Sequence, residues 1–333
     1  MTLEEYNAIK ANTIADLPFT EADIFDPEES PLLEEVLKSF DFYYKTLVSE
    51  CAHYGITEPY IFISSDTSKN ASAGSIGTKY VIKLNVGLLH WLISKFQLGT
   101  EIMVNADLKA LEKLDNKLDI GINEFYYQLA SHFTFYHELG HLIQRSPLLN
   151  PGIQERSIVN HEAFNLESHI LEYDADCYSV LCLANHTVDY YERLFQDDLD
   201  KEVIEAITIL SGTVISQYLL TFVNDIDDLY YKECLHPHPA IRLLYSLMTF
   251  CTYLKDAWHK KGVDINFETI FLNIFYESIN LEENFLGTKN SAKLLEIINS
   301  ARPDLLRYIG ELQSLVSGRE DLAVYKRNQT LIP

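Results

Sequence analysis

The chain has 333 residues, of which 47% are hydrophobic and 23% are charged, a composition typical of a folded protein rather than a disordered one. Its formal charge of −23 argues against binding to nucleic acid or to an anionic membrane surface, because both need clustered Lys and Arg. The five cysteines contain no CxxC pair, so they indicate neither a disulfide framework nor a four-cysteine zinc site. The N-terminal segment MTLEEYNAIK lacks the basic and apolar regions of a signal peptide. We therefore expect a cytoplasmic protein with neutral or basic partners, no nucleic-acid ligand and no membrane association.

The predicted elements follow the hydrophobic pattern along the chain. Residues 1–30 are acidic and show no periodic pattern, whereas Ser30-Pro31 is typical of a helix start and predicts a helix to about Tyr54. The runs 59–64 and 79–85 predict two strands separated by a long Ser/Gly/Asn-rich turn. Beyond them, apolar residues recur at three- and four-residue spacing and predict helices over 86–97, 122–145, 162–184, 202–223, 239–257, 267–278 and 291–315. These elements predict an α+β fold dominated by helices.

One apolar stretch, 206–223, is long enough to be mistaken for a membrane span. It contains no charged residue, but serines, threonines and a glutamine dilute it, and both of its flanks are acidic. A spanning helix usually has a basic cytoplasmic flank. We expect a buried helix here, and a membrane anchor is the alternative.

The predicted helix over 122–145 contains the HExxH pattern as HELGH at 137–141. Two imidazoles four residues apart lie on one face of a helix, so His137 and His141 can bind a single Zn²⁺, while Glu138 lies beside the water on the metal as general base. The alternative is a helix whose histidines are only hydrogen-bonded in the core. The apolar residues around the motif argue against this alternative, because ionisable groups are costly in such surroundings unless a metal compensates them.

A catalytic zinc ion needs a third protein ligand and one open position. Downstream, the segment EYDAD at 172–176 places Glu172 and Asp176 on one face of another predicted helix. We expect Glu172 to bind the metal and Asp176 to accept a hydrogen bond from a ligating imidazole. Glu167 and His169 are competing ligands nearby, although neither has an acid four residues further on.

The segments HELGH at 137–141, EYDAD at 172–176 and HPHPAIR at 236–242 together resemble the HExxH, ExxAD and HPxxxxR motifs of the gluzincin peptidases related to HtpX and the CAAX prenyl proteases. Upstream, Asn70-Ala71 and the GLL sequence at 87–89 are similar to a turn and a helix start of that family, so the resemblance covers about residues 59–245. The chain departs from those membrane proteases because it lacks confident transmembrane helices around the motifs. In size and layout it also resembles the soluble phage-exclusion peptidases of the Lit type.

The resemblance implies a small sheet packed on a zincin-like helical core, with one Zn²⁺ held by His137, His141 and Glu172. It also implies Arg242 as a structural ion-pair partner behind the site and His236 as a donor to the oxyanion. On this basis we expect an acidic N-terminal segment and helix at 1–58, a gluzincin catalytic domain at 59–257 and a helical C-terminal extension at 258–333.

The activity expected from these residues is hydrolysis of peptide bonds in an intracellular protein substrate. An extended peptide is expected to pair with an exposed edge of the strand 79–85, at Tyr80, Val81 and Ile82. Two alternatives remain open. One is a regulatory protein that keeps the zinc-binding fold and acts by binding a partner, with a role in phage defence, and the other is a protease anchored by 206–223.

The remaining candidates are weaker. His236 and His238 near Cys234 suggest a separate small metal site, but no second cysteine pair accompanies them. Cys177 and Cys182 are interpreted as core residues. We expect His90, His132 and His161 to be ordinary core or surface histidines, and 106–118 to be a solvated helical face.

Overall fold

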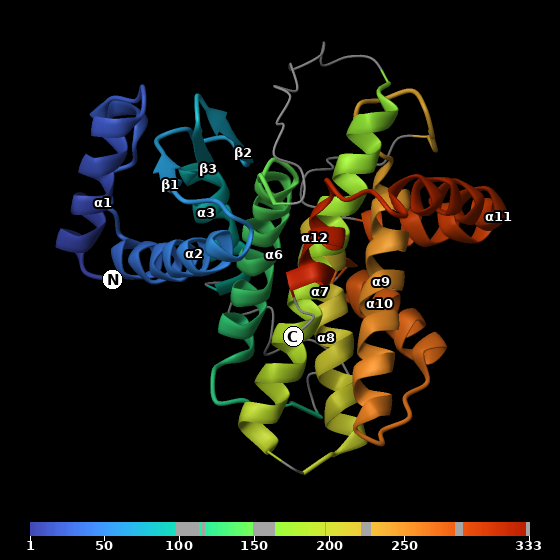
Figure 1. Cartoon of the computed structure of the whole chain (residues 1–333). Coiled ribbons are helices and arrows are strands. Elements are labelled where there is room, and N and C mark those ends of the chain that lie inside the picture. Colours follow the sequence, from blue (N-terminus) through green and yellow to red (C-terminus); the bar gives the residue numbers. More distant parts are fainter. Residues whose placement is uncertain are drawn as a thin grey trace. The chain divides into compact units, whose positions relative to one another are not determined.

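The computed structural model describes residues 1–97, 113–114, 117–148, 164–196, 198–220, 228–283 and 289–330 (Figure 1). Helices dominate the described residues, which also form a three-stranded sheet, so the predicted α+β class is confirmed. The chain divides into two compact units. The first comprises Met1–Lys95, Thr134–Ser157 and Gly318–Pro333, and the second comprises Phe96–Phe133 and Ile158–Ser317.

These units do not follow the predicted domain boundaries. The expected boundary at 257 falls inside helix α9 (Pro239–Lys260). The expected C-terminal extension is also divided, because residues up to Ser317 belong to the second unit and the rest to the first. A break in hydrophobic periodicity marks the end of an element, whereas a domain boundary depends on which elements pack together.

The first unit begins with helix α1 (Leu3–Asp16), in a segment where no pattern was predicted. A capping box starts this helix: Thr2 Oγ1 accepts a hydrogen bond from the backbone of Glu5, whose carboxylate accepts one from the backbone of Thr2. Tyr6 is buried and donates to the carbonyl oxygen of Phe25. The T-x-x-E signal was present in the sequence, but few apolar residues accompany it. After α1 comes a short 3₁₀ turn, η1 (Glu21–Asp23).

Helix α2 (Leu33–His53) confirms the helix predicted to end near Tyr54, although it begins just after Pro31 instead of at it. Ser30 Oγ accepts from the backbone of Leu32 and shapes the entry. The helix buries one apolar stripe at three- and four-residue spacing, formed by Val36, Phe40, Tyr43, Leu47 and Cys51.

The sheet contains the two predicted strands, β1 (Pro59–Ser64) and β3 (Lys79–Asn85), and a third strand, β2 (Ala71–Ile76), where only a turn was expected. The strand order is β1-β3-β2; β1 pairs with β3 in parallel and β2 pairs with β3 antiparallel. Ile76 pairs with Lys79 across a tight turn in which Gly77 has φ of 60°. The Ser and Gly content hid β2, because its side chains supply little apolar area.

Helix α3 (Val86–Leu92) directly follows β3 and continues as a π-helical turn, η2 (Ile93–Gln97). At the junction, Asn85 holds the loop between β1 and β2. Asn85 is buried, accepts a hydrogen bond from Ser64 Oγ and donates one to Ser68 Oγ. Gly87 packs directly on this loop, because a Cβ atom there would lie 1.9 Å from the carbonyl oxygen of Thr67. This close approach explains why glycine occupies the helix start.

The C-terminal helix α12 (Ala323–Thr330) belongs to the first unit and contacts the end of helix α6 (Ile122–Gln144). Lys326 is fully buried, and its Nζ donates to the carbonyl oxygens of Ile143 and Ser146 and to Ser146 Oγ, at 2.9 to 3.0 Å. A cation at this position stabilises the C-terminal end of a helix, where carbonyl groups lack partners within the helix.

The second unit is a helical bundle built from α7 (Leu166–Phe195), α8 (Lys201–Leu220), α9, α10 (Phe267–Leu281) and α11 (Asn290–Val316), together with the first half of α6. α7, α8, α9 and α10 run side by side, and α11 crosses them near one end (Figure 1). Helices α8 and α10 approach closely at Gly212, where a Cβ atom would collide with Ile274. The helices predicted from periodicity are therefore confirmed, and α7 extends eleven residues beyond its predicted end at 184.

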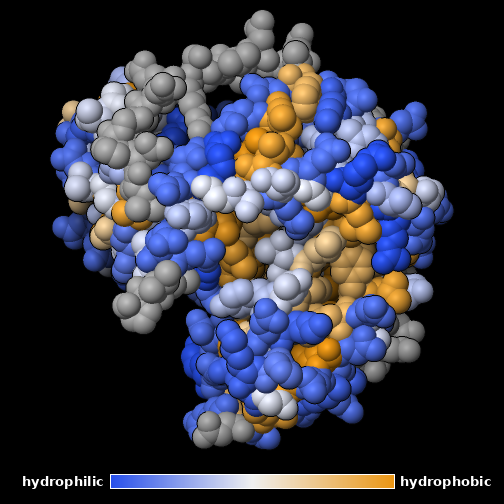
Figure 2. Space-filling view, turned by 45° about the vertical axis from the view of Figure 1, so that its right-hand side comes forward, coloured by the Kyte–Doolittle hydropathy of each residue, from blue (hydrophilic) through white to orange (hydrophobic). Residues whose placement is uncertain are grey.

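Among the described residues, α8 is the one helix long and apolar enough to cross a membrane by length and composition. However, 94% of its apolar window is buried inside the structure, so the expected buried helix is observed over Lys201–Leu220. The molecular face in Figure 2 is mostly hydrophilic, with apolar patches between polar side chains. Residues 221–223 and most of the predicted solvated helix 106–118 lie outside the described residues.

Candidate metal centre

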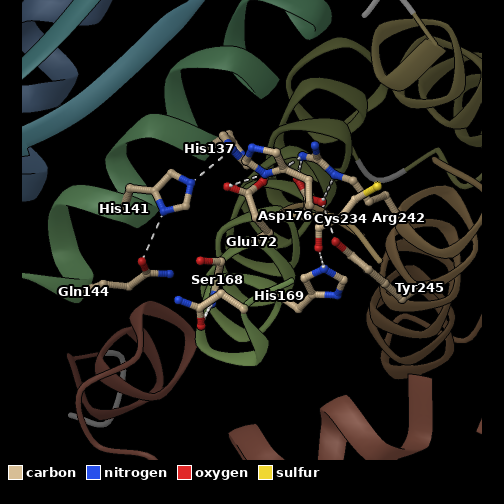
Figure 3. Close-up of polar contacts among 12 residues, drawn as sticks. His137, His141, Gln144, Ser168, His169, Glu172, Asp176, Cys234, Arg242 and Tyr245 are labelled. Atoms are coloured by element: carbon tan, nitrogen blue, oxygen red, sulfur yellow. Dashed lines mark hydrogen bonds and ion pairs between the residues drawn. The ribbon is translucent and has the colours of Figure 1, made fainter. Parts of the chain in front are cut away.

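Helix α6 brings the two histidines of the HExxH motif together. His137 and His141 lie one turn apart, and their Nε2 atoms are 3.2 Å from each other (Figure 3). His141 Nδ1 lies 3.1 Å from Gln144 Oε1. The amide oxygen can only accept, so the proton of a neutral His141 is on Nδ1 and its Nε2 lone pair points toward His137. Gln144 thus orients a predicted ligand, a role that no motif in the sequence indicated.

The separation of the two Nε2 atoms fits a shared zinc ion. Zinc–nitrogen bonds of about 2.0 to 2.1 Å at a tetrahedral angle place two ligating nitrogens about 3.3 Å apart. Two imidazoles and one carboxylate are also a donor set typical of catalytic zinc sites with one open position. The residues present therefore fit the metal that the motif predicts.

Helix α7 carries the predicted third ligand, Glu172, in a group of charged side chains. Arg242 Nη2 lies 3.4 Å from one carboxylate oxygen of Glu172, and His236 Nδ1 lies 3.4 Å from the other. Arg242 also binds Asp176 through two hydrogen bonds of 2.8 Å, and Tyr245 donates one of 2.6 Å to Asp176 (Figure 3). The ion pair expected for Arg242 is therefore present.

The role found for Asp176 differs from the expected one. It was expected to accept a hydrogen bond from a ligating imidazole, whereas both of its oxygens accept from Arg242, and one also accepts from Tyr245. Asp176 is fully buried, where an unpaired carboxylate would be costly, and the guanidinium of Arg242 compensates its charge. Asp176 binds Arg242, and Arg242 in turn lies beside Glu172. Asp176 thus supports the predicted ligand Glu172 through Arg242, whereas a direct contact with a histidine was predicted.

The pKa shifts follow from burial and from these ion pairs. Burial by itself lowers the pKa of Arg242, but Asp176 and then Glu172 outweigh burial and raise it well above its ordinary value. Burial and Asp176 both raise the pKa of Tyr245 well above its ordinary value. Arg242 therefore stays charged and Tyr245 stays a neutral hydrogen-bond donor at any physiological pH.

The three predicted ligands come together. One ligand atom from each of His137, His141 and Glu172 lies within 4.8 Å of the other two, a group that could hold a metal ion. Ser179 Oγ of α7 donates a hydrogen bond of 2.8 Å to the carbonyl oxygen of Phe133, which lies one turn before His137 in α6. Glu138, the predicted general base, is buried with 7% of its surface exposed.

Glu167 and His169, the two competing candidates for the third ligand, both lie on α7. His169 is fully buried and uses both ring nitrogens, since Nε2 lies 2.9 Å from the carbonyl oxygen of Cys234 and Nδ1 lies 2.8 Å from Tyr308 Oη. His169 is therefore part of the packing around the site. The backbone of Glu167 is bound by the N-cap Asn165 at the start of α7.

The proposed small metal site at Cys234, His236 and His238 does not form. His238 is buried and caps helix α9, because its Nδ1 accepts from the backbone of Ala240 at 3.0 Å. His236 instead lies beside Glu172. Pro239, which follows His238, occupies the first position of helix α9.

The predicted peptide-binding edge at Tyr80, Val81 and Ile82 is wrong, because these residues belong to the central strand. β3 pairs with β1 on one side and with β2 on the other, so neither of its edges is free. Within the same unit, Tyr80 Oη donates to the carbonyl oxygen of Arg145 at the end of α6. Tyr80 therefore helps to join the sheet to the HExxH helix.

The other candidate residues have structural roles. Cys177 is buried, and burial raises the pKa of its thiol to about 12, which fits a core residue rather than a nucleophile. His90 packs edge-on against Phe25, and His132 packs on His186. Cys182 is partly buried. His161 lies outside the described residues.

No protein-family model, no curated protein and no solved structure matches this chain.

Proposed function

We propose that this chain is a zinc-dependent endopeptidase of gluzincin type that cleaves an intracellular protein substrate. The observation that carries the proposal is the 3.2 Å separation of His137 Nε2 and His141 Nε2 on one helix, which fits two corners of a tetrahedral zinc site. Glu172, with its carboxylate near both histidines, supplies a third ligand. A bound zinc ion would polarise the scissile carbonyl and make water a nucleophile near neutral pH.

The residues around this centre have separate tasks in the proposed reaction. Glu138 takes the proton of the attacking water and delivers it to the leaving amine. His236, with 57% of its side chain exposed, lies beside Glu172 and can donate a hydrogen bond to the developing oxyanion. Arg242 and Asp176 fix the carboxylate of Glu172 from behind.

The substrate is proposed to be a neutral or basic protein segment in extended form. The formal charge of −23 favours such partners. Among the described residues, β2 pairs with β3 on one side, and its other edge offers backbone groups to an extended peptide. Five free cysteines, three of them buried, are consistent with the cytoplasm as the compartment.

The test compares wild type, Glu138→Gln and a matched control, Glu124→Gln, which changes an acid near the start of the same helix. Zinc content, melting temperature and cleavage of casein are measured for each. We expect Glu138→Gln to keep zinc and fold but to lose hydrolysis by about 100-fold or more, because an amide cannot accept the proton of water. Equal cleavage by Glu138→Gln and wild type would contradict the peptidase proposal.

The metal itself is tested by elemental analysis of protein purified without chelators. We expect one zinc ion per chain, and a sharp loss of zinc in Glu172→Ala, because two imidazoles leave the metal without a third ligand. A zinc content near zero in wild type would contradict the proposed cofactor. A protein that retains zinc and fold but cleaves nothing would favour the regulatory, partner-binding alternative.

A further inference from the structure

The segment Tyr230–His238, here named the His236 loop, connects the second unit's helices around the candidate centre. It begins with Tyr230, whose ring packs edge-on against His238, and it ends where His238 caps helix α9. His236 lies near its end, 3.4 Å from Glu172. Because a long side chain on a loop is only as well placed as its backbone, the position of His236 depends on what holds this loop.

His169 of α7 holds the middle of the His236 loop. Its Nε2 lies 2.9 Å from the carbonyl oxygen of Cys234, two residues before His236. A carbonyl oxygen only accepts, so Nε2 carries the proton and Nδ1 of the neutral ring accepts from Tyr308 Oη at 2.8 Å. Burial lowers the pKa of His169, which favours this neutral form. One imidazole therefore links α7, the His236 loop and α11.

Helix α11 gives the loop a second point of attachment. The ring of Tyr231 packs edge-on against Tyr308, with centroids 5.5 Å apart. Lys232 pairs with Glu311 at 3.4 Å, and its Nζ lies 5.7 Å from the ring centroid of Tyr308. Tyr308 thus contacts both the loop and the imidazole that binds the loop.

We propose that His169 and Tyr308 are positioning residues that hold His236 beside Glu172. The proposal rests on the proposed function, in which His236 acts on the oxyanion, but the positioning itself has a readout without substrate. Helix α11, which the sequence suggested was a separate extension, would then support the candidate centre through the His236 loop. His169 acts through the backbone carbonyl of Cys234, and Tyr308 acts through His169 and through its contacts with Tyr231 and Lys232.

The first experiment measures amide hydrogen exchange of the peptide that covers the His236 loop. We expect His169→Phe, which keeps an aromatic ring and loses both hydrogen bonds, to raise exchange in this loop by about 10-fold, the effect of losing a buried hydrogen bond. Tyr308→Phe removes one oxygen atom and is expected to show a smaller rise. His259→Phe, at an exposed histidine paired with Asp264, is the matched control. Unchanged exchange in the loop for both variants would overturn the proposal.

The second experiment is a double-mutant cycle with casein hydrolysis as the readout. We expect His169→Phe to lower kcat by about 10-fold while zinc content is unchanged, as losses of supporting contacts do. In a His236→Ala background the same change should have little further effect, because both act on one interaction. His169→Gln, whose amide can still donate to Cys234, should recover part of the activity. Additive effects of the two substitutions would show that His169 does not act through His236.

The two experiments separate the positioning role from the proposed function. Faster exchange in the loop without any hydrolysis by wild type would support the positioning and contradict the peptidase. Unchanged exchange in the variants, together with hydrolysis by wild type, would contradict the positioning and support the peptidase. If His169→Phe fails to fold, the Tyr308→Phe variant alone decides the outcome, because its single lost hydroxyl leaves the packing of α11 in place.

Discussion

Arg242 and Asp176 form a two-point ion pair in which Nε and Nη2 of the guanidinium each lie 2.8 Å from a carboxylate oxygen. Asp176 is fully buried, whereas Arg242 reaches forward to Glu172. This geometry is that of a bidentate pair, which fixes direction as well as charge. The pair therefore links the core of the helical unit to a predicted metal ligand.

Replacing Asp176 with Asn should destabilise the protein and weaken zinc binding together. The partly buried guanidinium of Arg242 loses its two-point partner, and we expect the free energy of unfolding to fall by about 3 kcal/mol. Zinc affinity should fall by about 10-fold, because Arg242 no longer fixes Glu172. Urea denaturation and competitive zinc titration measure the two effects. Asp256→Asn, at an exposed acid of α9, is the control, and a variant of Asp176 that behaves like this control would refute the assignment.

Replacing Gln144 with Ala should weaken zinc binding while stability changes little. The amide oxygen of Gln144 lies 3.1 Å from His141 Nδ1, and its loss frees the ring to rotate and to change tautomer. We expect zinc affinity to fall by about 10-fold in a competitive titration. Gln128→Ala, which removes a hydrogen bond to Glu124 on the same helix, serves as the control. An unchanged affinity would mean that Gln144 does not orient the ligand.

Replacing Gly87 with Ala should be strongly destabilising, in contrast to Gly310→Ala. The added methyl group at Gly87 would lie 1.9 Å from the carbonyl oxygen of Thr67, and backbone cannot move aside as a side chain can. We expect a loss of about 3 kcal/mol or more. At Gly310, inside α11, the methyl group meets no atom within 4 Å, and alanine should raise the free energy of unfolding by about 0.5 to 1 kcal/mol. Thermal unfolding of both variants decides the matter, and similar melting temperatures would contradict the packing seen at Gly87.

Stability should fall as the pH drops below about 6.5, in part because of the His132–His186 pair. Burial, and then the charge of His186, lower the pKa of His132 well below its ordinary value. Burial also lowers the pKa of His186. As the pH falls, the unfolded chain binds protons that the folded chain does not. The contribution of these histidines to the free energy of unfolding is therefore complete above their unfolded pKa and decreases below it. One such group contributes a slope of at most about 1.4 kcal/mol per pH unit.

The measurement is urea denaturation from pH 5 to pH 8. We expect His132→Phe to show a shallower loss of stability below pH 6.5 than wild type. His53→Gln, at an exposed histidine of α2, should keep the wild-type slope. If His132→Phe and wild type lose stability in parallel, the pair does not contribute to the acid sensitivity.

The sequence by itself determined most of the elements and the pair of histidines in the candidate metal centre. Helical periodicity is a local property, and so is the four-residue spacing that places His137 and His141 on one face of a helix. The same locality placed the predicted domain boundary at 257 within helix α9, because the end of an apolar pattern says nothing about which helices pack together. It also hid β2, whose Ser and Gly residues form a strand only because β3 lies beside them.

Tertiary structure alone decided which distant groups meet. The central position of β3 follows from parallel pairing with β1 on one side and a hairpin with β2 on the other. His169 finds Tyr308 across 139 positions, and Lys326 reaches the end of the HExxH helix across 183. No periodic pattern encodes such pairs. They form because a buried donor or acceptor needs a partner, and only the folded chain determines which partner lies within reach.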